Sequence, residues 1–359
     1  MTDTPKSAHS HLNLHQHHDN PFSRPQSPHN SLQIGFVGLG AMGYPMAKNL
    51  AKARPGHFSL LVWNRTKSKA EQLVKEVGGD KVHIADDLAE VARDCDIIFT
   101  NLASDAVVKS VFLEFEAALK TAQFTRHKIF VETSTVFPSL AGELDTLISS
   151  THHASLVMAP VFGRPHAAEA AQLLIVMAGD YRSKKEIAHI LIPAVGRKVI
   201  DLGGNLEKAP TFKLIGNSLI LGTLEVLAEV FTLGEKSGIP TSQVFGLIKE
   251  LMPAPTIINY AEKMSHDLFD GTQGFAIDGG VKDSTHIRRL ATELNSPMPA
   301  LDTAHEHLLT ARALHASKKA RGQQVFETLD WSSLVAGART SAGLDGFDSA
   351  KHSRVVPED

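Results

Sequence analysis

The stretch IGFVGLGAMGYPMAKNL, residues 34–50, decides the fold of this chain. An apolar run of strand-forming residues ends at Gly38 and a helical pattern begins near Ala41, so a Gly-x-Gly-x-x-Gly loop falls at a strand-to-helix turn. In such a loop Gly38 makes the tight turn, Gly40 lets the backbone approach a pyrophosphate, and Gly43 lets the helix pack on the strand. The N–H groups at the start of the helix then face the phosphates. We predict a dinucleotide-binding loop, with a glycine-rich turn in another α/β protein as the plainer alternative; its residues are Gly38, Leu39, Gly40, Ala41, Met42 and Gly43.

The composition narrows the class of protein. With 359 residues the chain is long enough for two domains, and a formal net charge of -3 gives no basic field for nucleic acid. As the single cysteine, Cys95 cannot form an internal disulfide and lies beside an apolar run, which fits a reducing compartment. No uninterrupted apolar run reaches the roughly 18 residues of a bilayer span. We expect a soluble protein with a small-molecule substrate and no nucleic-acid or membrane partner, in the cytoplasm, with a mitochondrial location left open.

The chain divides into four parts. Residues 1–31 are rich in histidine and lack apolar periodicity, so we predict a disordered tail with no specific metal site. Residues 32–204 alternate short apolar runs with helical stretches, which predicts a Rossmann-type doubly wound sheet. Residues 205–328 predict an all-α domain joined to the sheet by a long buried helix, and residues 329–359 predict a loose tail. The predicted strands are Gln33–Val37, Ser59–Trp63, Asp96–Thr100, Lys128–Glu132, Ser155–Ala159 and Leu173–Ala178.

The loop after the second predicted strand indicates which cofactor binds. It reads Asn64-Arg65-Thr66-Lys67-Ser68-Lys69. A site for NAD usually carries an acid about twenty residues beyond the glycines, which accepts hydrogen bonds from the ribose. This loop has no acid, and Arg65 offers a planar fork suited to the 2′-phosphate of NADP. We predict that Asn64, Arg65 and Thr66 bind the cofactor and that NADP is preferred over NAD; the alternative is a solvated helix start.

Hydroxyl side chains follow the fourth predicted strand, at Ser134 and Thr135. Hydroxyl and backbone N–H groups at such a strand end can hold a carboxylate or the nicotinamide ribose. The alternative is capping of the next helix, which has Pro138 in its first turn. We predict that these two residues bind ligand.

A lysine lies near the start of the longest apolar helix, predicted over Thr211–Lys236 and expected to be buried between domains or in a dimer. Lys213 and Asn217 are four residues apart and share one face. Burial would lower the pKa of the Lys213 ammonium toward neutrality, which suits a general acid/base. We predict that Lys213 is catalytic, with a side chain that reaches solvent as the alternative. A later pair, Lys282 and Asp283, is compatible on the residues alone with a surface ion pair.

Taken together, these segments resemble the β-hydroxyacid dehydrogenase family. That family includes 3-hydroxyisobutyrate dehydrogenases and glyoxylate/succinic semialdehyde reductases and is related to 6-phosphogluconate dehydrogenase. The likeness covers about residues 33–320. It rests on the glycine stretch, on Glu132–Pro138, on the strand end Ala159-Pro160-Val161, on Lys213 with Asn217, and on Lys282 with Asp283.

The resemblance implies a role for each matching residue. Lys213 would be the acid/base, and Asn217 would orient the substrate. The other implied roles concern the ligands: substrate and cofactor contacts at Ser134 and Thr135, cofactor contacts at Leu102 and Ala103, and a place near the nicotinamide for Lys282.

One departure from the family bears on the substrate. Many members have Ser-Gly-Gly after Ala-Pro-Val, and its hydroxyl and amides hold the carboxylate of the acid. This chain has Phe162-Gly163-Arg164 instead. Phe162 removes a hydroxyl and adds apolar bulk, while Arg164 is able to grip an anion with two hydrogen bonds. We predict that Gly163 and Arg164 bind substrate, with an external salt bridge as the alternative for Arg164.

Three functions follow from these observations. The first is an NADP-dependent oxidoreductase that interconverts a small β-hydroxy acid and its semialdehyde or keto form. The second is a reductase of imines or bulkier carbonyls, suggested by Phe162. The third is a non-catalytic NADP-binding module, since this fold also serves as a scaffold. We expect a homo-oligomer, either a dimer or a tetramer.

Overall fold

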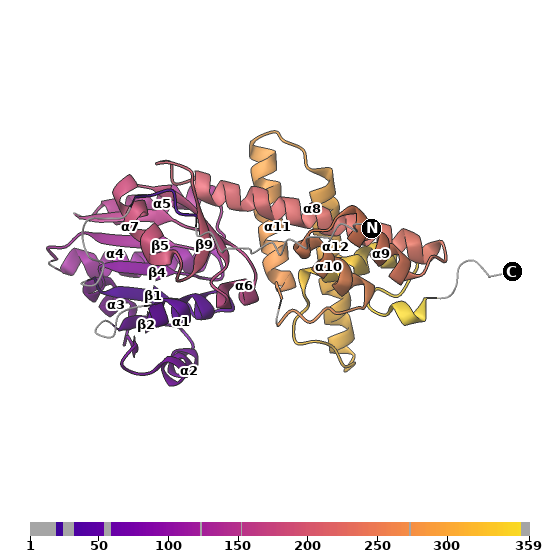
Figure 1. Cartoon of the computed structure of the whole chain (residues 1–359), viewed down its shortest axis with the longest axis horizontal. Coiled ribbons are helices and arrows are strands. Elements are labelled where there is room, and N and C mark those ends of the chain that lie inside the picture. Colours follow the sequence, from indigo (N-terminus) through magenta and orange to yellow (C-terminus); the bar gives the residue numbers. More distant parts are fainter. Residues whose placement is uncertain are drawn as a thin grey trace, which may run out of the picture.

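The computed structural model describes residues 19–23, 32–53, 59–122, 124–151, 153–272 and 274–352. In this part of the chain every named strand lies between Ile34 and Asp201, and the named elements from Lys208 onward are helical. Figure 1 shows the two regions side by side, with helix α8 (Lys208–Lys236) running from the sheet into the helical domain. The predicted fold class, a Rossmann-type sheet followed by a helical domain, is confirmed.

The sheet has the strand order β3-β2-β1-β4-β5-β6-β8-β7, with β9 paired to β8. Strands β1 to β6 run parallel to one another, whereas β8 is antiparallel to β6 and β7. The order reverses between β1 and β4, which is where open α/β sheets bind ligands at the carboxyl ends of their strands. The strands are β1 Ile34–Val37, β2 Leu60–Trp63, β3 Val82–Ile84, β4 Ile97–Thr100, β5 Lys128–Glu132, β6 Ala154–Met158, β7 Val161–Phe162, β8 Leu173–Gly179 and β9 Gly196–Asp201.

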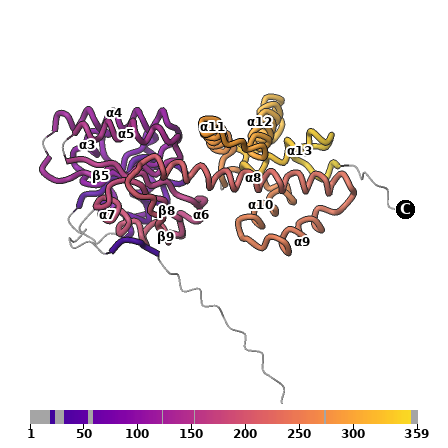
Figure 2. Tube along the Cα trace, turned by 90° about the horizontal axis from the view of Figure 1, so that it is seen from above, coloured from indigo at the N-terminus to yellow at the C-terminus, as the bar shows by residue number. Residues whose placement is uncertain are grey.

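Helices cover both faces of the sheet and give it two apolar cores. One core is closed by α1 (Gly43–Ala53), α2 (Lys67–Val77), α6 (Pro165–Glu169) and α7 (Tyr181–Leu191). The other is closed by α3 (Leu88–Asp94), α4 (Asp105–Thr121) and α5 (Pro138–Ser149). Figure 2 shows α3, α4 and α5 together on one side of the sheet and α7 on the other. A sheet buried on both faces explains why its strands are nearly continuous apolar runs.

The helical domain packs around α8 and has a third apolar core. Its other elements are α9 Thr241–Leu251, α10 Pro255–Ser265, α11 Ile277–Glu293, α12 Pro299–Ala320, the 3-10 turn η2 Trp331–Leu334, α13 Val335–Ser341 and the 3-10 turn η3 Ser349–Lys351. In Figure 2, α11, α12 and α13 lie on one side of α8 and α9 and α10 on the other.

In the single chain, the expected burial of α8 between the domains or in a dimer holds for one face of the helix. Leu214, Leu221 and Leu224 are buried, whereas Leu219 is 71% exposed and Leu233 is 68% exposed. By length and hydropathy alone α8 would be able to cross a membrane. Its buried face packs on α10, α11, α12 and α13.

Three strands escaped the sequence analysis: β3, β7 and β9. Strands β3 and β7 have three and two residues, too short for a period to show. Strand β9 carries Arg197 and Lys198, because it lies at the side of the sheet where charged side chains reach solvent.

The prediction of a loose tail from residue 329 is wrong as far as residue 352. Trp331 and Leu334 are buried in the core of the helical domain. Arg339, which is fully buried, forms ion pairs with Glu235 at 2.7 Å and Asp267 at 2.6 Å. The residues around these anchors are small and show no helical period, which is why the sequence predicted a loose tail. Residues 353–359 of the predicted tail lie outside the described residues.

The prediction of a disordered tail over residues 1–31 is wrong at residues 19–23. The backbone of Asp19 pairs with that of Lys198 on β9, and its carboxylate contacts the Lys198 ammonium at 2.6 Å. Phe22 is buried and packs edge-on against Tyr181 of α7. The rest of that prediction, with its histidines, lies outside the described residues.

Candidate active site between the two domains

The glycine loop fits a bound dinucleotide at each of its three glycines. Gly38 has a φ of +98°, and a Cβ there would lie 2.2 Å from the backbone oxygen of Asn101. A Cβ on Gly43 would lie 2.0 Å from the backbone oxygen of Gly38, so the helix packs on the turn itself. Among the described residues, no atom lies within 4 Å of the position that a Cβ on Gly40 would take. The loop is therefore closed toward the protein and open at Gly40, where a pyrophosphate would approach.

The second cofactor loop is tied to the first. The backbone N–H of Leu39 donates to Asn64 Oδ1 at 2.8 Å, and Asn64 Nδ2 donates to the backbone oxygen of Thr66 at 2.9 Å. Asn64 therefore sets the spacing between the two loops rather than offering a free side chain. Arg65 and Thr66 are exposed beside it.

A buried carboxyl joins the loops that follow β4 and β5. Glu132 accepts hydrogen bonds from the N–H of Ser134 and the hydroxyl of Thr100, both at 2.5 Å. Ser134 Oγ in turn accepts from the N–H of Leu102 at 2.7 Å. Burial raises the pKa of Glu132 to about 7. The network fixes Leu102 and Ser134 relative to each other, although Thr100 and Glu132 were not among the predicted site residues.

Lys213 and Asn217 meet as the helical spacing predicts. Lys213 Nζ donates to Asn217 Oδ1 at 2.9 Å, and Asn217 Nδ2 donates to Asp283 Oδ2 at 2.7 Å. Because a carboxylate only accepts, Asp283 orients the amide so that its oxygen faces the lysine. Burial lowers the pKa of Lys213 to about 8, an effect that Asp283 opposes and Lys282 adds to.

Lys282 connects the two domains. It forms an ion pair with Asp283 at 2.8 Å and donates to the backbone oxygen of Thr135 at 2.5 Å. Asp283 is buried, so the alternative of a surface ion pair is wrong. A second contact joins His286 on α11 to Asp105 on α4 at 3.1 Å. The loop after β5 and the helix that carries Asp283 therefore form one side of the site.

A cavity of about 300 Å³ opens beside Lys213. Three predicted substrate residues, Gly163, Arg164 and Asn217, line it. The fourth, Ser134, is buried against Leu102 and Glu132 and is not among the lining residues. The remaining walls are Phe162, Ala167, Ile220, Thr256, Tyr260, Phe275 and Trp331.

Arg164 is held at this cavity by the helical domain. It donates a short hydrogen bond to Asn259 Oδ1, and its guanidinium lies 5.4 Å from the ring centre of Tyr260. Burial raises the pKa of Tyr260 to about 12, so this phenol stays neutral. In the described part of the chain the contacts found for Arg164 are therefore with an amide and a ring, which leaves its charge available to an anion.

The sequence analysis missed the walls supplied by the helical domain. Tyr260, Phe275 and Trp331 lie on segments with no motif, and Trp331 fell in the predicted loose tail. Asp283 was visible only as the neighbour of Lys282. Its contact with Asn217 depends on α11 crossing α8, which no local spacing shows.

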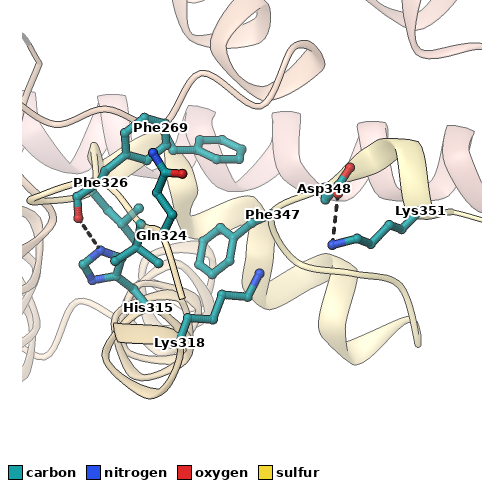
Figure 3. Close-up of a pocket in the computed structure, with 10 residues that line it drawn as sticks. Phe269, His315, Lys318, Gln324, Phe326, Phe347, Asp348 and Lys351 are labelled. Carbon is teal, nitrogen blue, oxygen red and sulfur yellow. Dashed lines mark hydrogen bonds and ion pairs between the residues drawn. The ribbon is translucent and has the colours of Figure 1, made fainter. Parts of the chain in front are cut away.

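A second cavity, of about 390 Å³, lies at the far end of the helical domain. Figure 3 shows Phe269, Phe347 and Lys318 around it, together with the contacts between His315 and Phe326 and between Asp348 and Lys351. It shares no lining residue with the cavity beside Lys213. Its contacts anchor the C-terminal segment on α12.

Two family descriptions match consecutive parts of the chain. Residues 33–204 match the NAD binding domain of 6-phosphogluconate dehydrogenase. Residues 208–326 match the NAD-binding domain of NADP-dependent 3-hydroxyisobutyrate dehydrogenase. The first match covers the sheet, and the second covers the helices that carry Lys213 and Lys282.

Individual proteins agree with these matches. An uncharacterized oxidoreductase of Shewanella frigidimarina is 31% identical over 252 residues, 70% of this chain and 82% of that protein. Glyoxylate/succinic semialdehyde reductase 1 of Arabidopsis thaliana is 28% identical over 289 residues, 79% of this chain and 93% of that protein. The 3-hydroxyisobutyrate dehydrogenase of Mycobacterium tuberculosis shares the fold with a TM-score of 0.70 at 22% identity, over 86% of this chain and 99% of that one. The chain is an NAD(P)-dependent oxidoreductase acting on CH–OH groups, and it belongs to the β-hydroxyacid dehydrogenase family.

Proposed function

We propose that this chain is an NADP-dependent oxidoreductase that interconverts a small β-hydroxy acid and its semialdehyde or keto form, with Lys213 as the general acid/base. The observation that carries the proposal is the buried Lys213 ammonium, which lies in a cavity that also holds Arg164. An acid/base and an anion-binding group in one small cavity suit a substrate with a carbonyl at one end and a carboxylate at the other.

Each residue of the site has a separate role in the proposed reaction. A bound nicotinamide cofactor supplies or accepts the hydride. In reduction, the ammonium of Lys213 donates a proton to the developing alkoxide, and in oxidation its neutral amine removes the hydroxyl proton. A pKa of about 8 lets both forms of Lys213 exist near neutral pH. Asn217 holds Nζ in place, and Arg164 binds the carboxylate.

Removing the amine tests the role of Lys213. Lys213→Ala should abolish turnover of β-hydroxy acids and semialdehydes while the affinity for NADPH, measured by fluorescence titration, stays close to that of wild type. Lys208→Ala, an exposed lysine at the start of the same helix, is the control. Turnover by Lys213→Ala at the wild-type rate would refute the assignment.

Arg65 supports the preference for NADP. Arg65→Asp replaces the guanidinium with a charge that repels a 2′-phosphate. We expect NADPH to bind at least about tenfold more weakly, as the loss of a charged hydrogen bond implies, with little change for NADH. Lys75→Asp, an exposed position later on α2, makes the same change in net charge and should leave both affinities unchanged. Equal affinities of the wild-type protein for NADPH and NADH would refute the preference.

The second candidate is a reductase of imines or bulkier carbonyls. Phe162 favours it, because an apolar ring lines the cavity where many family members have a serine. A panel of β-hydroxy acids, semialdehydes and cyclic imines, each with NADPH or NADP, separates the two candidates. Tight NADPH binding with no turnover across the panel would instead support a non-catalytic module.

The exposed face of α8 supports the expected homo-oligomer. Its exposed apolar residues, Ile215, Leu219, Val226, Val230 and Leu233, are spaced almost symmetrically about residue 224. Across a twofold axis each residue on one copy meets, on the antiparallel second copy, the residue equally far on the other side of the axis, so an apolar face that is symmetric about its midpoint is complementary to itself. We propose that a second copy of the chain packs on this face.

A further inference from the structure

We propose that Tyr260 binds the carboxylate of the substrate together with Arg164, with the phenol as a hydrogen-bond donor and the guanidinium as the positive charge. This inference deepens the proposed function and rests on it, since it concerns the same cavity. It adds a residue of helix α10 to the substrate site, on a segment where the sequence shows no motif. It also restricts the substrate to molecules that carry an anion at the end that Arg164 binds.

Tyr260 and Arg164 lie together in the wall of the cavity beside Lys213. The Arg164 guanidinium lies 5.4 Å from the centre of the Tyr260 ring, and it donates to Asn259, the residue before Tyr260 on α10. One helix therefore positions both the phenol and the guanidinium. Tyr260 is only 3% exposed, yet it is one of the residues that line the cavity. An anion that contacts Arg164 there would lie close to the ring that carries the phenol.

The Tyr260 ring is held in place by aromatic neighbours. Trp331 packs edge-on against it with 5.9 Å between ring centres, and Trp331 packs in turn against Phe275 at 4.5 Å. The backbone N–H of Trp331 donates to the backbone oxygen of Phe275 at 2.9 Å. All three residues line the cavity. The ring is thus ordered before a ligand binds, which lowers the entropy cost of a hydrogen bond to its hydroxyl.

The proton of the phenol is left for a ligand. Burial raises the pKa of Tyr260, whereas Trp331 lowers it by acting as a hydrogen-bond donor. This contact is longer or less linear than a normal hydrogen bond, since Trp331 Nε1 has no partner of normal geometry among the described residues. An indole N–H only donates, so the phenol accepts on that side and its own proton points elsewhere. In the described part of the chain, Trp331 is the hydrogen-bonding side chain found to act on this phenol.

The surroundings also keep the phenol neutral. Burial and, after it, the charge of Asp330 raise the pKa of Tyr260 to about 12. Asp330 is itself fully buried and accepts from Lys263 at 2.8 Å and from the backbone N–H of Phe275 at 3.0 Å. Tyr260 therefore keeps its proton at neutral pH. A tyrosinate would repel a carboxylate, whereas a neutral phenol donates a charge-assisted hydrogen bond to it.

The test compares a β-hydroxy acid with its neutral amide. The protein is saturated with the reduced cofactor that it binds more tightly, so neither probe is oxidised, and affinities are measured by ligand-observed NMR titration. Tyr260→Phe should bind 3-hydroxypropanoate at least about tenfold more weakly than the wild type, as the loss of a hydrogen bond to a charged group implies. The loss for 3-hydroxypropanamide should be smaller, because a hydrogen bond to a neutral oxygen is weaker. Tyr181→Phe, which removes an exposed phenol on α7, should change neither affinity.

Labelled tyrosine reports the contact directly in the wild-type protein. The chain has three tyrosines, so carbon-13 at Cζ gives three signals. The variants Tyr44→Phe and Tyr181→Phe assign two of them, and the third is Tyr260. 3-Hydroxypropanoate should shift the Tyr260 signal and leave that of Tyr181 in place. This measurement decides the question even if Tyr260→Phe does not fold.

Binding and turnover separate this inference from the proposed function. The inference is overturned if Tyr260→Phe binds the cofactor and keeps the wild-type affinity for 3-hydroxypropanoate, if it loses affinity equally for the acid and the amide, or if the Tyr260 signal does not move. It is also overturned if the wild-type protein binds the acid no more tightly than the amide. If binding changes as expected but the wild-type protein oxidises no hydroxy acid with NADP or NAD, the proposed function fails and the inference about Tyr260 stands.

Discussion

The burial of Lys213 should lower the stability of the folded chain at neutral pH. Replacing it with methionine keeps an unbranched side chain of similar length and removes the ammonium. We expect Lys213→Met to be inactive and, at pH 7, more stable than the wild-type protein. A catalytic group held in an unfavourable environment commonly trades stability for activity in this way.

The size of the effect follows from the pKa. A fall from 10.5 to about 8 means that protonated Lys213 weakens folding by about 3 kcal/mol at pH 7, at 1.36 kcal/mol per pKa unit. Methionine removes that cost but leaves Asn217 Oδ1 without its donor. An unpaired buried acceptor costs about 1–3 kcal/mol. The net gain for the variant at pH 7 should therefore be about 1 kcal/mol.

The pH dependence gives the sharper signature. Between about pH 8 and pH 10.5 the unfolded chain keeps the Lys213 proton that the folded chain has lost, so the wild type gains stability as the pH rises. The advantage of Lys213→Met should shrink by about 1 kcal/mol between pH 7 and pH 9, from these pKa values. Urea unfolding at a series of pH values, followed by far-ultraviolet circular dichroism, measures this difference.

A matched lysine separates burial from loss of charge. Lys208→Met removes an ammonium from an exposed position on the same helix, and its effect on stability should stay constant from pH 7 to pH 9. If the stability difference between Lys213→Met and the wild type were equally constant, burial would not control the titration of Lys213. The argument for its role as acid/base would then lose its electrostatic basis.

Three other parts of the structure make equally direct predictions. Burial raises the pKa of Glu132 to about 7, so the folded chain holds this proton more tightly than the unfolded chain, and the free energy of unfolding should fall as the pH rises from about 4.5 to 7. Glu132→Gln should make this fall smaller. An equal change in melting temperature between pH 5 and pH 7 for the variant and the wild type would contradict this. Arg339→Met leaves two carboxylates near an apolar core and should lower the free energy of unfolding by about 3–5 kcal/mol. A loss under about 1 kcal/mol in urea titration would show that the C-terminal segment contributes little. Leu219→Glu should reduce the mass measured by light scattering to that of one chain, and an unchanged mass would exclude α8 as the interface.

The parts of the fold that the sequence predicts are those encoded locally. The glycine loop can be predicted from the sequence because Gly38 and Gly43 lie against atoms of their own turn and of the neighbouring loop, where a side chain would not fit. All six predicted strands begin and end within one residue of the observed bounds, and Lys128–Glu132 matches at both ends, because each strand is a largely apolar run. The contact between Lys213 and Asn217 can be predicted because four residues make about one helical turn.

The remaining parts depend on which segments meet in space. Trp331 reaches the cavity beside Lys213 only because the segment after α12 folds back across the helical domain. The loop after α12 and the short turn around Trp331 have no period that would reveal this. Glu132 is similar, since its role depends on Thr100 from a neighbouring strand lying opposite it. Sequence spacing along a single strand cannot show such a contact.

The chemistry of Lys213 depends on a neutral group lying between two charges. Asp283 is buried, and in direct contact with Lys213 it would form an ion pair that keeps the ammonium protonated far above neutral pH. Asn217 lies between them, donating to the carboxylate and accepting from the lysine. The carboxylate therefore orients the lysine through the amide and also pairs with Lys282, so its charge is shared. Burial then outweighs attraction, and the lysine keeps a pKa of about 8. The geometry thus needs the amide of Asn217, whose oxygen accepts from Lys213 and whose nitrogen donates to Asp283, as much as it needs the lysine.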